Sequence, residues 1–198
     1  MNLIGLGEIR AALDGSWLLL RNRPEGMAFF DQSIQGFWRS FGVVTLLIPA
    51  FLVARLTTRK LFFEQNLYHP DMFPNGAYWF AHTLGLAADW LTFPIVLAAL
   101  ALPLGISRRY VPFIVARNWT SLLASTPYLV VYSLFLLGIL STELTVILLY
   151  LLLPVIIWYS YLVTRIALQA SPSLAIGIVV LDFVLTLLID QAVGHLWG

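Results

Sequence analysis

Acidic and basic side chains lie inside long apolar stretches of this sequence, and they are the residues best placed to do chemistry. Asp89 and Asp182 each lie near the middle of such a stretch. His82 precedes Asp89 by seven residues, about two helical turns, and so shares its predicted helix face. Together with Asp190, these groups are candidates to relay protons or bind a cation, because an ionisable group at membrane depth is costly. The alternative is structural, since a buried Asp also joins helices by hydrogen bonding.

A basic segment supplies possible partners for these carboxylates. Arg117, Asn118 and Trp119 stand at the predicted cytoplasmic start of the third span, where arginine snorkels and tryptophan marks the interface. The sharper hypothesis is that Arg117 pairs with Asp182, or that Arg165 does so from the fourth span, which lowers the cost of a buried carboxylate. The sequence thus predicts an intramembrane polar network of Asp89, Asp182, His82, Arg117, Asn118, Asp190 and Arg165.

Each of the first four apolar stretches carries one interior proline: Pro49, Pro94, Pro127 and Pro154. An interior proline removes a backbone hydrogen bond and kinks the helix. Four kinks at one level would create a waist of freed carbonyl groups, suited to a cavity or gate. The alternative is that the prolines only shape helix packing, because proline is common in membrane helices.

Other kinds of chemistry are excluded or unsupported. The absence of cysteine excludes disulfides, iron-sulfur clusters and thiolate zinc sites, and the three histidines are far apart in sequence. The motifs HExxH and GxSxG and a phosphate-binding glycine loop are missing. We therefore expect no enzymatic activity, cofactor or metal, although an aspartyl enzyme using Asp89 and Asp182 is conceivable. A net charge of +1 gives no basic field for nucleic acid.

The composition indicates the elements that must hold these residues. Of 198 residues, 60% are hydrophobic and 11% are charged, and the mean hydropathy is +0.88. Such a chain lacks the polar residues to cover a soluble globule. Long apolar runs without period-two alternation predict an all-α polytopic membrane protein rather than a barrel. About five stretches are long enough to span: 40–58, 77–102, 112–140, 143–165 and 173–195.

The first 37 residues form a separate predicted segment, cytoplasmic or interfacial, ahead of a transmembrane domain at 38–198. Leu6, Ile9, Leu13 and Trp17 recur at helical spacing, which predicts an amphipathic helix lying at the membrane surface. A partner-docking helix would show the same pattern. Asp31 is the expected N-cap of a short helix before the first span. The loop 58–78 is expected to be mostly irregular.

The charges of this segment also bear on processing and orientation. Glu8, Arg10 and Asp14 interrupt the apolar N-terminus, so we expect no cleavable signal and a mature chain beginning near Met1. Five spans place the termini on opposite sides. With the N-terminus in the cytoplasm, eight basic residues lie inside and three outside, which favours N-in and C-out in a bacterial inner membrane.

Two further patterns concern helix contacts. Ala81 with Gly85, and Ser173 with Gly177, are small residues four apart, a spacing that permits close helix packing. The fourth span is rich in aromatic residues, namely Tyr150, Trp158, Tyr159 and Tyr161. Such a surface faces lipid or another helix, and a pigment, quinone or lipid tail could also stack on it.

The overall layout resembles that of the Yip1-type membrane proteins. The resemblance rests on an amphipathic N-terminus before five closely spaced helices, and on the segments GFWRSF (36–41) and ARNW (116–119). It implies an accessory or scaffold role rather than catalysis. The leading hypothesis is therefore a non-catalytic subunit that contacts membrane lipids and other integral membrane proteins or forms a homo-oligomer. The alternative is a small, proton-linked transporter or channel component using Asp89, Asp182 and His82.

Overall fold

The computed structural model describes residues 4–198, and this part of the chain is helical with no strand. The all-α prediction is confirmed. The elements in chain order are α1 (Leu6–Leu20), the 3-10 helix η1 (Pro24–Phe29), α2 (Ile34–Phe41), α3 (Val44–Glu64), the 3-10 helix η2 (Pro70–Met72), α4 (Asn75–Leu100), α5 (Ser107–Leu136), α6 (Thr142–Leu168) and α7 (Pro172–Trp197).

Five helical segments are long and apolar enough to cross a membrane, as predicted: α2 with α3, and then α4, α5, α6 and α7. Helices suit a bilayer because they satisfy every backbone hydrogen bond internally. The helices differ in length from the predicted apolar stretches. Helix α3 continues through charged residues to Glu64, six residues beyond the first stretch, and α5 begins at Ser107, five residues before the third. Helix ends follow backbone caps, whereas hydropathy marks only the apolar part of a helix.

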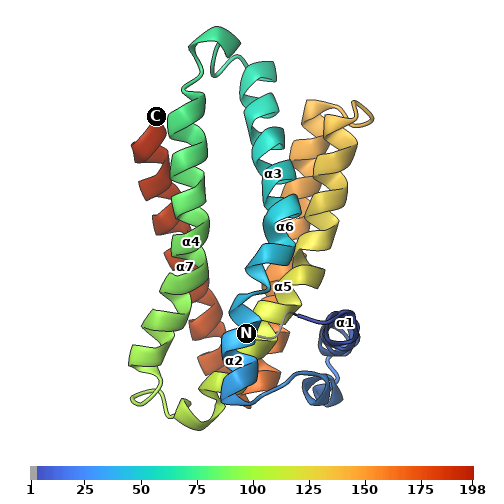
Figure 1. Cartoon of the computed structure of the whole chain (residues 1–198), viewed down its shortest axis with the longest axis vertical. Coiled ribbons are helices and arrows are strands. Elements are labelled where there is room, and N and C mark those ends of the chain that lie inside the picture. The colour runs from blue at the N-terminus through green and yellow to red at the C-terminus, as the bar shows by residue number, and fades with distance from the viewer. Residues whose placement is uncertain (1–3) are drawn as a thin grey trace.

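The long helices run side by side along the long axis of the molecule (Figure 1). We call the end that carries α1 and α2 the proximal end, and the end that carries the 65–74 loop and the C-terminus the distal end. Helix α5 packs against α3 and α6, while α4 packs along α7. Figure 1 shows α4 and α7 on one side of the molecule and the other three on the opposite side. A site between these two groups of helices therefore takes its residues from both groups.

Small residues bring α4 and α7 together. Gly85 is buried, and a Cβ atom added to it would lie 2.6 Å from the Cγ2 atom of Val193. Ala81, one turn away, is fully buried as well. This predicted pair of small residues therefore does form a close helix contact. The second pair does not, because a Cβ atom on Gly177 meets nothing within 4 Å.

Helix α1 lies across the bundle at its proximal end, where Figure 1 views it end-on. It buries Ala12, Gly15, Ser16 and Leu19. Of the predicted apolar face, Leu6, Leu13 and Trp17 are exposed, whereas Ile9 is partly buried against the core. The face with small residues packs against the bundle because it lets the backbone of η1 come close. A Cβ atom added to Gly15 would lie 2.8 Å from the carbonyl oxygen of Gly26. The exposed apolar face is available to a membrane surface.

Local structure around α2 corrects two expectations. The N-cap is Ser33 rather than Asp31, since the Ser33 hydroxyl accepts the N–H of Gly36. Asp31 instead accepts the N–H of Ser33, and hydrogen bonding to Ser33 holds the pKa of Asp31 below its usual value. The predicted irregular loop 58–78 is shorter, because α3 and α4 extend into it and η2 lies within it.

The four prolines lie inside helices but not at one level. Pro94 is six residues from the proximal end of α4, and Pro127 is twenty residues from the proximal end of α5. At 1.5 Å per residue, the two differ in depth by about 21 Å. Pro154 is fourteen residues from the proximal end of α6, between these two levels, and Pro49 is five residues from the start of α3. The four prolines therefore do not form a waist at one level, because helices that alternate in direction carry their prolines to different depths.

We predict that Gly85→Leu lowers the stability of the protein by about 1 to 3 kcal/mol, the usual effect of overpacking a close contact. Gly177→Leu is the matched control, because it makes the same change in a helix where space is open. Thermal unfolding in detergent, followed by tryptophan fluorescence, measures both. Equal stability of the two variants would contradict the close contact of α4 with α7.

Candidate functional site

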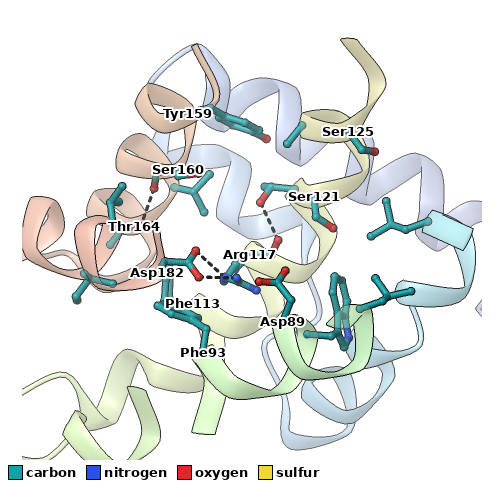
Figure 2. Close-up of a pocket in the computed structure, with 18 residues that line it drawn as sticks. Asp89, Phe93, Phe113, Arg117, Ser121, Ser125, Tyr159, Ser160, Thr164 and Asp182 are labelled. Carbon is teal, nitrogen blue, oxygen red and sulfur yellow. Dashed lines mark hydrogen bonds and ion pairs between the residues drawn. The ribbon is translucent and has the colours of Figure 1, made fainter. Parts of the chain in front are cut away.

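A cavity of about 340 Å³ lies between the long helices, and each of α3, α4, α5, α6 and α7 contributes to its wall. Figure 2 shows its polar side chains converging from different helices. The charged and hydroxyl-bearing lining residues are Asp89, Arg117, Thr120, Ser121, Ser125, Tyr159, Ser160, Thr164 and Asp182. The rest of the wall is apolar or aromatic.

The three charged residues meet because their helices place them at one depth. Arg117 lies ten residues from the proximal end of α5, Asp182 ten residues from that of α7, and Asp89 eleven from that of α4. Each is therefore about 15 Å from the proximal helix ends. The sequence predicted Arg117 at the start of the third span, whereas α5 begins ten residues before it, at Ser107. Arg117 belongs to the middle of the bundle.

Arg117 and Asp182 form a two-point ion pair between α5 and α7. The Nη2 atom of Arg117 is 2.8 Å from Oδ1 of Asp182, and Nε is 3.3 Å from Oδ2. The guanidinium also lies 4.4 Å from the ring centre of Phe93, a cation–π contact from α4. Of the two pairings considered from the sequence, this one is present. Arg165 is instead exposed near the proximal end, where it donates to the hydroxyl of Tyr161.

Asp89 faces the same cavity with a weaker partner. Its Oδ1 atom accepts the hydroxyl of Thr186, at 2.9 Å, and within residues 4–198 it forms no ion pair. In Figure 2 the Arg117 guanidinium lies between Asp182 and Asp89. When both carboxylates are ionised, the single guanidinium leaves the cavity with a net charge of −1.

The cavity hydroxyls are arranged as acceptors. Ser121, Ser125 and Thr164 donate to backbone carbonyls of their own helices, at 2.6, 3.0 and 2.7 Å. Such back-bonding uses the one hydroxyl hydrogen and leaves oxygen lone pairs free. Tyr159 likewise donates its hydroxyl to the Ser16 carbonyl of α1, at 2.8 Å. With the carboxylates, these oxygens make the cavity rich in hydrogen-bond acceptors, which suits a ligand that donates.

The remaining members of the predicted network lie elsewhere. Asn118 is buried on the other side of α5, where it donates to Ser40 of α2 at 3.0 Å. His82 lies seven residues from Asp89, or about 10 Å toward the distal end, and contacts Arg55. Asp190 is exposed on α7. The structure thus brings together Asp89, Asp182 and Arg117, places Asp190 one turn beyond Thr186, where its charge acts on Asp89, and separates the other three.

Sequence reasoning missed the hydroxyl residues and Thr186. Ser121 and Ser125 are four residues apart inside an apolar stretch, so they share a helix face, and that spacing was the available signal. Phe93 carried no signal, because nothing distinguishes it from other aromatic residues of apolar helices. Within the described residues, no group of three His, Asp or Glu side chains is placed to hold a metal ion.

Comparisons of the chain with protein-family models, with curated proteins and with solved structures give no match. The fold and the site therefore define only a class: an α-helical protein with five helices able to span a membrane and an ion pair in a central polar cavity. The resemblance to Yip1-type proteins stays a prediction.

We predict that removing one member of the ion pair destabilises the protein more than removing both. Arg117→Met leaves Asp182 without its cation, and Asp182→Leu leaves Arg117 without its anion, whereas the double variant leaves neither. The expected coupling is about 1 to 3 kcal/mol, measured by thermal unfolding of all four proteins in nanodiscs. A double variant whose loss equals the sum of the single losses would show that the pair does not join α5 to α7.

Proposed function

We propose that this protein is a small carrier that exchanges a small organic cation for a proton across the membrane. The observation that carries the proposal is the central cavity, in which one carboxylate, Asp89, forms no ion pair with any of residues 4–198, while Asp182 is paired with Arg117. The sequence suggested a transporter that uses Asp89, Asp182 and His82 as an alternative function. The present proposal develops that alternative, with Arg117 rather than His82 as the third residue of the site.

The charge of the cavity argues for exchange. With both carboxylates ionised, the cavity carries −1, and one proton or one monovalent cation neutralises it. A proton and a cation bound together would give the cavity a net positive charge, so the proton and the cation compete for the same negative charge. Because a net charge in the middle of the bilayer is costly, the neutral forms are those that can change conformation at low energy. Obligatory exchange of cation for proton follows from that requirement.

The hydrogen-bonding groups argue for the kind of cation. Hydroxyl oxygens of Ser121, Ser125 and Thr164 keep free lone pairs, so a ligand with several N–H groups is favoured over one without. Aromatic rings in the wall, among them Phe93 and Phe113, add cation–π attraction. A guanidinium or a primary ammonium compound small enough for about 340 Å³ meets these requirements.

The membrane and the orientation are part of the proposal. The excess of basic residues at the proximal end supports placing that end in the bacterial cytoplasm, with the distal end outside. The exposed Leu6 and Trp17 of α1 then lie at the cytoplasmic membrane surface, as expected for an interfacial helix.

The test uses proteoliposomes with trapped pyranine, to which guanidinium or methylguanidinium is added outside. Both probes stay charged, so neither crosses the bilayer as a neutral base. We predict that the internal pH rises as protons leave in exchange, and that Asp89→Asn reduces the rate more than about tenfold, because it removes a charge contact of several kcal/mol.

Asp14→Asn is the matched control, since it makes the same substitution on an exposed position of α1 that does not line the cavity, and it should leave the rate unchanged. The proposal fails if neither probe moves protons through the folded wild-type protein. It also fails if both Asp→Asn variants lose flux to the same degree.

An accessory role, as the Yip1-type resemblance implies, is the second candidate. The observation that favours it is an apolar groove of about 450 Å³ between α6 and α7, lined by Pro154, Trp158, Tyr161 and Val180 among others. Trp158 is exposed there, and aromatic residues commonly anchor such contacts. A stoichiometric partner that co-purifies with the wild type, is lost in Trp158→Ala and is kept in Ile147→Ala would support this role.

A further inference from the structure

A second cluster of polar groups lies at the distal end, outside the central cavity. It consists of Arg55 and Arg59 of α3, His82 of α4 and Trp197 of α7, packed around the aromatic rings of Phe73 and Tyr78. The Nη1 atom of Arg55 is 3.1 Å from Nδ1 of His82, and the His82 and Trp197 ring centres are 5.9 Å apart. Arg59 lies over Phe73, which contacts Trp197 in turn. The cluster is therefore one continuous unit that joins three helices.

Hydrogen-bond donors exceed acceptors in this distal cluster. Four buried nitrogen atoms have no hydrogen-bond partner in the described part of the chain: Nε of Arg55, Nε of Arg59, Nε2 of His82 and Nε1 of Trp197. Because Arg55 is always a donor, Nδ1 of His82 must accept from it, which places the hydrogen of the neutral ring on Nε2. All four atoms are thus N–H donors. A buried donor without an acceptor costs about 1 to 3 kcal/mol.

The positive charge of the cluster is also uncompensated. Among residues 4–198, neither Arg55 nor Arg59 forms an ion pair, and Glu64, the acidic residue nearest to them along α3, pairs with Lys60. Arg55 lies nine residues before the distal end of α3, and His82 seven residues after the start of α4. These two residues are therefore about 10 to 14 Å inside the helix ends. Arg59 is five residues from the end of α3 and Trp197 is the last residue of α7, so the cluster extends inward from the distal helix ends.

We infer that the distal cluster binds the phosphate group of an anionic phospholipid. Phosphate supplies the negative charge and the acceptor oxygens that the cluster lacks, and arginine matches its geometry with paired N–H groups. Exposed apolar side chains are also available to contact the acyl chains of the lipid. Leu52 and Leu56 of α3, and Phe80 and Leu84 of α4, are exposed next to the cluster and present a surface for acyl chains.

The first experiment measures binding of phosphatidylglycerol to the purified protein by native mass spectrometry. We predict that Arg55→Gln/Arg59→Gln weakens binding at least fivefold relative to the wild type. Arg108→Gln/Arg109→Gln, which removes the same charge from exposed positions at the proximal end, should leave binding unchanged. Equal binding by all three proteins would overturn the inference.

A second measurement needs no variant and covers the case in which the double glutamine variant does not fold. Phenylglyoxal labels accessible arginines, and the labelled residues are identified by mass spectrometry. We predict that phosphatidylglycerol protects Arg55 and Arg59 but not Arg108 or Arg109, and that diacylglycerol protects none of them. Labelling of Arg55 and Arg59 that phosphatidylglycerol leaves unchanged would overturn the inference.

The same labelling distinguishes a lipid from a free anion. Protection by phosphatidylglycerol, with none by 10 mM inorganic phosphate, on the order of cellular concentrations, assigns the site to lipid. Equal protection by inorganic phosphate overturns the assignment to a phospholipid and leaves a site for a soluble oxyanion.

Discussion

The ion pair between Arg117 and Asp182 is the interaction on which the rest of this molecule depends. It joins α5 to α7, and so links the group formed by α3, α5 and α6 to the group formed by α4 and α7. An arginine in the middle of a span needs an anion, and Asp182 supplies one at 2.8 Å. Once this pair is satisfied, Asp89 remains as an additional carboxylate in the same cavity. The proposed exchange of a cation for a proton rests on that excess of one charge.

The central cavity and the distal cluster have complementary electrostatics. The cavity holds more carboxylates than cations and faces its ligand with acceptors, whereas the distal cluster holds unpaired cations and donors. They are close along α4, because Leu86 of the cavity wall is one turn from His82. If the distal end faces outside, a cation entering from there passes Arg55 and Arg59. A lipid phosphate on the cluster would remove that repulsion, so the two proposals support each other while resting on different residues.

Much of the helical architecture could be predicted from the sequence, because apolar stretches of about 20 residues have few other stable forms. Depth could not be predicted as well. Hydropathy placed Arg117 near a membrane surface, whereas α5 begins ten residues earlier. The pairing of Arg117 with Asp182 was among the predicted alternatives, but the position of Arg117 along its helix was not predicted. His82 shares a helix with Asp89, yet its neighbours are Arg55 and Trp197, which come from helices whose register no local pattern encodes. For the same reason, Arg55 and Arg59 were counted only as two of the three basic residues on the outer side.

The central claim is that Asp89 carries either a proton or the bound cation. Infrared difference spectroscopy of the protein in a supported bilayer tests it directly, by following the carbonyl band of protonated carboxyl groups while guanidinium is added at mildly acid pH. We predict that guanidinium diminishes this band in the wild-type protein and in Asp14→Asn, and that the change is absent in Asp89→Asn. A band that guanidinium leaves unchanged in the wild type, or that changes equally in Asp89→Asn, would contradict the account.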